Sequence, residues 1–271
     1  MPRVFEICDF IIRQEAFEKL IERIRMPAEY AREAMDALWQ ELDEFACTEK
    51  REYPQGTRAM VRQLLAALAN RASGAWCGIE EDVWIDTLKC FSRYANEHKR
   101  MYGFYGFDRA DWTERHVNAR IFRLGELEYE LKQNADGAPV LGIHIPSDAV
   151  LEKSALNASV KRAREFFAAH FPKYADAPMT CESWLLSYEV ASVLGAKSRV
   201  LTFRHAFEPI QSGGDCIDAL IKFVFKLPPD TPCKTDYAAL PERTRLEKGL
   251  KRLLLEGKTV CTGSGVLKRE F

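Results

Sequence analysis

The uneven distribution of glycine is the feature that most constrains how this chain can fold. The first hundred residues contain three glycines, Gly56, Gly74 and Gly78, whereas the remaining 171 residues contain twelve. Glycine supplies the backbone conformations that turns need and weakens the interior of a helix. We therefore expect a region of uninterrupted helices followed by a region rich in turns.

Apolar residues recur at helical spacing in four stretches of the first region. The clearest stripe is Phe17, Leu20, Ile21 and Ile24, at the spacing i, i+3, i+4 and i+7 that defines one helix face. Four amphipathic helices cannot each remain soluble alone, so their apolar faces should pack together as a small bundle. We place this helical domain at residues 1–110.

The second region, residues 111–271, shows patterns of both strands and helices. Apolar residues alternate with Glu126, Glu128 and Glu130, which predicts a half-buried strand. Further strands are expected over 140–145, 180–186, 200–203 and 207–211, and helices over 160–171, 217–225 and 241–256. Asn157 or Ser159 is the expected N-cap of the first of these helices, and Gly263-Ser264-Gly265 is expected to form a terminal turn.

Charge and cysteine content exclude several classes of protein. The net charge is -1, so no overall field attracts nucleic acid or an anionic membrane. No apolar run approaches the length of a membrane span, and the N-terminus lacks an apolar signal core, so we expect a cytoplasmic protein. Eight cysteines are present without any Cys-x-x-Cys pair, which favours buried reduced thiols over a zinc site or disulfides.

Five short motifs, in order along the chain, resemble a family of bacterial two-domain acyltransferase-like proteins. The motifs are Tyr105-Gly106-Phe107-Asp108 with Trp112, Phe122-Arg123-Leu124-Gly125-Glu126-Leu127, His144-Ile145-Pro146, Cys181-Glu182-Ser183-Trp184-Leu185-Leu186, and Leu240-Pro241-Glu242-Arg243-Thr244-Arg245-Leu246. The resemblance implies an α+β protein, in which a helical N-terminal domain precedes a GNAT-like domain, a mixed β-sheet flanked by helices. It also implies acyl transfer from CoA.

The resemblance places the reacting groups where the fourth and fifth strands of the GNAT fold separate. His144 on one strand is a candidate base, since imidazole titrates near neutrality, and Glu182 on the other is a second candidate. Glu128 on the adjacent strand is a third. Tyr188 resembles, in position, the tyrosine that protonates the leaving thiolate in many GNAT enzymes. Each has a structural alternative: a hydrogen-bonded strand histidine, solvated carboxylates and a packed aromatic ring.

The resemblance also implies a site for acetyl-CoA or another acyl-CoA, and no metal. GNAT enzymes hold the CoA pyrophosphate with a glycine-rich loop at a helix N-terminus. The corresponding segment here, residues 147–159, has no glycine and contains two acids. The candidate CoA-binding residues are Ile145, Lys153, Ser159, Lys161 and Arg162.

Two functional hypotheses remain open at this point. The first is an acyltransferase that moves an acetyl or other acyl group from CoA to an amine on a small molecule or peptide. The second is a non-catalytic GNAT-fold module that binds a small metabolite or peptide, because the expected glycine loop is missing.

Overall fold

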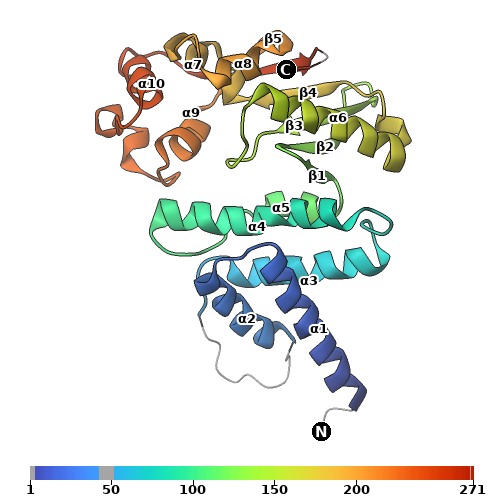
Figure 1. Cartoon of the computed structure of the whole chain (residues 1–271). Coiled ribbons are helices and arrows are strands. Elements are labelled where there is room, and N and C mark those ends of the chain that lie inside the picture. Colours follow the sequence, from blue (N-terminus) through green and yellow to red (C-terminus); the bar gives the residue numbers. More distant parts are fainter. Residues whose placement is uncertain (1–3, 43–51, 269) are drawn as a thin grey trace. The chain divides into compact units, whose positions relative to one another are not determined.

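The computed structural model describes residues 4–42, 52–268 and 270–271, and the chain separates into two compact units, Met1–Phe122 and Arg123–Phe271 (Figure 1). The predicted α+β fold, with a helical region followed by a mixed sheet, is confirmed. Each unit buries its own set of apolar side chains.

The first unit is built from helices. They are α1 Val4–Arg23, α2 Ala28–Leu42, α3 Thr57–Ser73, α4 Glu81–Tyr102 and α5 Ala110–Val117. The predicted stripe of α1 is buried, with Phe17 and Ile24 fully covered. The aromatic segment after α4 also packs within this unit, since Tyr105 stacks on Tyr30 and Phe107 stacks on Phe91.

The second unit contains a six-stranded sheet in the order β1-β2-β3-β4-β6-β5. Its strands are β1 Ile121–Leu124, β2 Leu127–Gln133, β3 Pro139–His144, β4 Met179–Ser183, β5 Phe207–Asp215 and β6 Cys261–Leu267. Strands β3 and β4 are parallel, whereas β2 with β3, β4 with β6, and β5 with β6 are antiparallel. Parallel neighbours need a long connection, and here it includes the helix α6, Lys153–His170.

Helix α6 packs on one face of the sheet, against the side chains of β2 that point to that face. The ring of Phe167 meets the ring of Tyr129 edge to face at 6.3 Å. Ser159, in the middle of α6, is buried and accepts hydrogen bonds from the Tyr129 hydroxyl at 3.0 Å and from the backbone N–H of Leu127 at 3.2 Å. The expected N-cap at Asn157 or Ser159 is therefore wrong: the helix begins at Lys153, two turns earlier along the chain.

A second apolar cluster lies among the helices after β4. They are α7 Tyr188–Val193, α8 Arg199–His205, α9 Ile217–Ala219 and α10 Arg245–Leu255, with a π-helical turn η3 at Leu220–Phe225 and 3-10 turns η2 at Trp184–Leu186, η4 at Pro232–Lys234 and η5 at Tyr237–Ala239. One further 3-10 turn, η1 at Pro172–Tyr174, lies between α6 and β4 and outside this cluster. Leu220, Phe225 and Leu250 are fully buried in this cluster.

Three sequence-based assignments are wrong. Residues 200–203 belong to helix α8, where burial of Phe203 against Phe207 outweighs the strand preference of Val200. The strand expected over 180–186 ends at Ser183, because its hydroxyl accepts the N–H of Leu185 and caps the turn η2. The glycine-rich segment 261–267 is not a terminal turn but strand β6.

The glycines of β6 are explained by close contacts with neighbouring backbone. A Cβ atom at Gly263 would lie 2.4 Å from the carbonyl oxygen of Leu186, and one at Gly265 would lie 3.1 Å from that of Pro209. A side chain at Gly263 would collide with that backbone, and one at Gly265 would be tightly crowded. The glycines therefore mark a strand that other backbone approaches closely, rather than a turn.

Candidate functional site

The parallel strands β3 and β4 stay paired over only three residue pairs, the last of which is Ile143 with Cys181. Beyond this pair β3 continues to His144, while β4 continues to Ser183 in contact with β6 on its other side. The two strands run in the same direction, so their unpaired ends lie at one edge of the sheet. The family resemblance predicted that the reacting groups lie at this edge.

Three of the predicted catalytic side chains lie on one face of this sheet. Glu128 on β2 is directly opposite His144 on β3. Gly142 pairs with Thr180 on β4, and Glu182 follows Thr180 by two residues. Paired residues direct their side chains to the same face, and residues two apart share a face. His144, Glu128 and Glu182 therefore all belong to the face opposite α6.

His144 has a close acidic partner that the sequence did not single out. Its Nε2 atom lies 2.8 Å from Oε2 of Glu130, whose side chain is only 5% exposed. Glu130 pairs with Gly142, which has no side chain, so the carboxylate can reach the ring two residues further along β3. The register of two adjacent strands was needed to find this pair.

The glutamates of β2 are also more buried than the prediction of a half-buried strand implies. Glu128 is 2% exposed and Glu130 is 4% exposed. Glu126, which precedes the strand, accepts the N–H of Val150 at 2.7 Å. Its role is visible in the structure: it holds the segment that leads from β3 to α6.

Glu182 and Cys181 point to opposite faces of β4. Glu182 is exposed at the open edge, whereas Cys181 is buried. Burial raises the pKa of the Cys181 thiol, and the charge of Glu182 adds to the effect. A neutral buried thiol is not a nucleophile, which agrees with the prediction that Cys181 is inert.

Of the cysteines whose side chains the structure describes, Cys77, Cys181, Cys216, Cys233 and Cys261 are free thiols, and Cys90, Cys181 and Cys216 are buried. Cys77 is exposed, so the expectation of burial fails there. Cys47 lies outside the described residues.

Tyr188 is not brought to the edge between β3 and β4. Its hydroxyl donates to the carbonyl oxygen of Ile210 on β5 at 2.9 Å, and the Arg204 guanidinium lies 4.5 Å from its ring centroid. Strand β6 separates β5 from β4, so this hydroxyl is about 10 Å, two strand spacings, from β4.

The residues proposed for CoA divide into two groups. Ile145 directly follows β3. Lys153 is exposed in the first turn of α6, close to N–H groups that have no helical carbonyl partner. Lys161 is exposed two turns further on and forms an i,i+4 pair with Glu165. Arg162 is half-buried, and the hydroxyl of Ser159 is engaged with β1 and β2.

The two acids of the glycine-free segment each have an arginine partner. Asp148 accepts from Arg123 at 3.0 Å, and Glu152 forms an ion pair with Arg199. These pairs offset the negative charge that would oppose a phosphate group at the start of α6.

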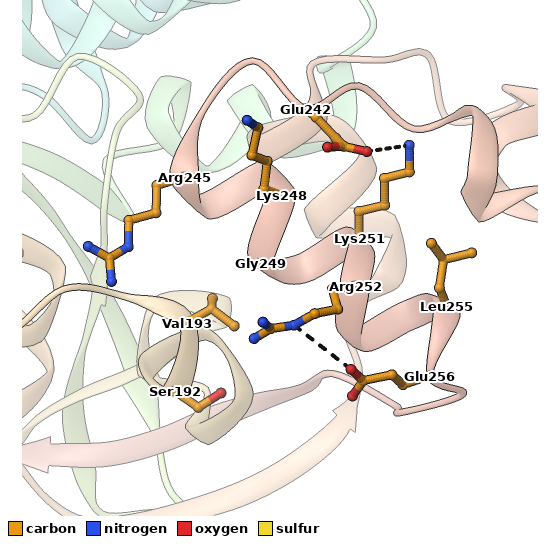
Figure 2. A pocket seen from close by; sticks show the side chains of 10 residues that line it. All are labelled: Ser192, Val193, Glu242, Arg245, Lys248, Gly249, Lys251, Arg252, Leu255 and Glu256. Carbon is orange, nitrogen blue, oxygen red and sulfur yellow. Dashed lines mark ion pairs between the residues drawn. The ribbon is translucent and has the colours of Figure 1, made fainter.

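A hollow of about 630 Å³ lies in the same unit between α7 and α10 (Figure 2). Its lining includes four basic and two acidic residues: Arg245, Lys248, Lys251, Arg252, Glu242 and Glu256. From the sequence, the basic residues of 243–252 are expected to form a solvated helix face, with a contact to the CoA 3′-phosphate as the alternative.

Two further features of the described residues concern metal binding and membrane insertion. Within residues 4–42, 52–268 and 270–271, no group of three or more histidine, cysteine or acidic side chains is arranged to hold a metal ion. In the same part of the chain, no helix is both long and apolar enough to cross a membrane.

Comparisons with known proteins agree with this architecture. A family model described as a GNAT-like C-terminal domain matches residues 121–267, and one described as an N-acyltransferase N-terminal domain matches residues 4–119. No curated protein matches the chain.

Two solved structures resemble the whole chain. The crystal structure of an acyltransferase in complex with decanoyl-CoA is 28% identical, with a TM-score of 0.76 over 92% of this chain and 86% of that one. The crystal structure of an acyltransferase in complex with decanoyl-CoA and teicoplanin is 25% identical, with a TM-score of 0.75 over 92% and 87% of the two chains. Together with the two family matches, these similarities show that the chain belongs to the two-domain GNAT-like acyltransferases, in which an N-acyltransferase N-terminal domain precedes a GNAT-like C-terminal domain.

Proposed function

We propose that this protein transfers an acyl group from acyl-CoA to an amine on a small-molecule or peptide acceptor. The observation that carries the proposal is the position of His144 and Glu182, on one sheet face at the edge where β3 and β4 lose their pairing. A thioester placed between the strands would meet an acceptor approaching from that face.

The side chains suggest how the reaction proceeds. Glu182 is exposed and attracts an ammonium group by its charge. With Nε2–H of His144 donating to Glu130, the lone pair of the neutral ring is on Nδ1, and this atom takes one proton from the ammonium. The resulting amine forms a bond to the thioester carbon, and the carbon–sulfur bond breaks. The nitrogen then gives up a second proton, which passes through water to the leaving thiolate, since the Tyr188 hydroxyl donates elsewhere.

The donor is proposed to bind at the start of α6. The first-turn N–H groups and Lys153 favour a pyrophosphate there. A similar protein was crystallised with decanoyl-CoA, so the test should include acyl groups longer than acetyl. Another was crystallised with teicoplanin, which makes an amine-bearing glycopeptide a rational first acceptor.

The test has a binding arm and a transfer arm. Isothermal titration should show binding of CoA, acetyl-CoA, octanoyl-CoA and decanoyl-CoA. Thiol release with an amine acceptor should be lost in His144→Ala, at an unchanged melting temperature and unchanged CoA affinity. Absence of binding of every one of these ligands up to millimolar concentration would sink the proposal.

The alternative is a non-catalytic module that binds a metabolite or peptide on the GNAT fold. The glycine-free segment between β3 and α6 favours it. This alternative predicts no thiol release with any acceptor, and equal acceptor affinity with and without CoA. Loss of a measured transfer reaction in His144→Ala, with folding intact, would exclude it.

A further inference from the structure

The hollow lies beside a close approach of α7 and α10. A Cβ atom at Gly249 on α10 would lie 2.5 Å from Cβ of Val193 on α7. Glycine at this position lets the helix backbones meet there, and the remaining lining consists largely of charged side chains that extend from α10 (Figure 2). The hollow is therefore open and polar, with a basic side.

The basic residues that line the hollow differ in whether they form an ion pair. Lys251 pairs with Glu242 at 2.9 Å, and Arg252 pairs with Glu256 at 3.8 Å, as the dashed lines in Figure 2 show. In the described part of the chain, neither Arg245 nor Lys248 forms an ion pair or a side-chain hydrogen bond, although the charge of Lys248 helps Lys251 to lower the pKa of the Glu242 carboxyl.

Arg245 and Lys248 are exposed and three residues apart on α10. Residues at this spacing are neighbours on a helix surface, so their like charges repel. The protein keeps this unfavourable pair at a hollow, where an anion from solution would neutralise both charges.

The hollow is linked to the start of α6 by a short segment. The Nη1 atom of Arg245 lies 3.0 Å from where a Cβ atom of Gly195 would be. Four residues later Arg199 pairs with Glu152, which immediately precedes α6. Four residues span at most about 14 Å, and the hydrogen bond from the Ser198 N–H to the Gly195 carbonyl shortens this segment by a turn. Both places are therefore within reach of one ligand with several phosphate groups.

We propose that Arg245 and Lys248 bind the 3′-phosphate of CoA. A phosphomonoester is a dianion near neutral pH. An arginine can donate two parallel hydrogen bonds to it, and a lysine can donate one from its ammonium group. The pyrophosphate of the same ligand would lie at the α6 N-terminus. This inference rests on the proposed use of acyl-CoA, but it can fail separately.

Isothermal titration with CoA and with 3′-dephospho-CoA tests the assignment. The wild-type protein should bind CoA about tenfold more tightly, the gain expected from two exposed charge pairs. In Arg245→Ala with Lys248→Ala, the affinity for CoA should fall to that for dephospho-CoA, whose own affinity should stay unchanged. Both side chains are exposed, so the melting temperature should change little.

Lys132→Ala with Lys173→Ala is the matched control, because it removes the same charge from exposed positions outside the hollow. This control should keep the preference for CoA. Equal wild-type affinity for the two ligands, or a preference that survives in the Arg245 and Lys248 variant, would overturn the site while leaving acyl transfer intact. A wild-type protein that binds neither ligand would overturn both proposals.

Discussion

The pairing of Glu130 with His144 is the most informative contact at the residue scale. The carboxylate is nearly enclosed, and the imidazole is one quarter exposed. An enclosed carboxylate that accepts one ring N–H fixes the orientation and tautomer of the ring. Glu130 touches His144 and not the reacting atoms, so we regard it as a positioning residue.

Replacing Glu130 with glutamine should lower kcat about tenfold to a hundredfold with little change in KM. This corresponds to about 1.5–3 kcal/mol, the usual value of a hydrogen bond to a charged group. Steady-state thiol release measures both constants. Glu165→Gln, the same change on the exposed face of α6, should have no effect, and Glu130→Asp should recover part of the rate. A kcat of Glu130→Gln equal to the wild-type value would contradict the role.

At the scale of single elements, α10 shows how a motif that resembles the family can be structural. Thr244 accepts the N–H of Glu247 at 3.1 Å, and Glu247 accepts the N–H of Thr244 at 3.1 Å, which forms a capping box. Arg243 donates to Glu247 and also to the last residue of the π-helical turn, Phe225. The motif therefore positions α10, the helix whose side chains line the hollow.

The capping box predicts a pH-dependent stability. Burial opposes ionisation of Glu247, but hydrogen bonds from Arg243 and two backbone N–H groups outweigh it, so the pKa of this carboxyl lies below its usual value. The charged form thus stabilises the fold above the unfolded pKa of about 4.3, and this stabilisation is lost as the pH falls through the lower folded pKa.

Glu247→Gln should therefore lose about 1–3 kcal/mol of unfolding free energy near neutral pH and much less near pH 3. Urea unfolding at both pH values measures the difference. Glu256→Gln, an exposed acid at the end of the same helix, should change stability by less than about 0.5 kcal/mol. An equal loss for Glu247→Gln at both pH values would show that the carboxylate charge is not involved.

The elements that the sequence predicts well are those whose signal is local. The stripe of α1 and strand β2 follow from the spacing of apolar residues alone. Helix α8 and strand β6 do not, because Phe203 stacks on Phe271 and Gly263 lies against the backbone of Leu186. Both contacts join segments that are far apart in the sequence. The same holds at the site: His144 and Glu182 stand out in the sequence, whereas Glu130 becomes significant only through its partner across the sheet.

At the scale of the whole molecule, the residues proposed for the donor belong to one unit. The first strand begins at Ile121, where the match to the GNAT-like domain also begins. A fragment of residues 121–271 retains all six strands, α6 and α10. The N-terminal unit supplies none of the proposed CoA contacts.

This fragment should therefore fold and bind CoA with an affinity within about threefold of that of the full chain, or about 0.7 kcal/mol. Circular dichroism checks folding, and isothermal titration checks binding. The Arg245 and Lys248 double variant of the fragment should show the same loss as in the full chain. A folded fragment without CoA affinity would assign part of the donor site to the N-terminal unit.

Strand β6 also has a consequence for how the protein is made. Strand β5 pairs only with β6 in the sheet, and β6 is synthesised 46 residues after β5 ends. Until those residues emerge from the ribosome, β4 and β5 both present unpaired edges, which are templates for association between chains. Premature termination before Cys261 should thus produce aggregates rather than a shortened soluble protein, and the nascent chain is most in need of a chaperone during this interval.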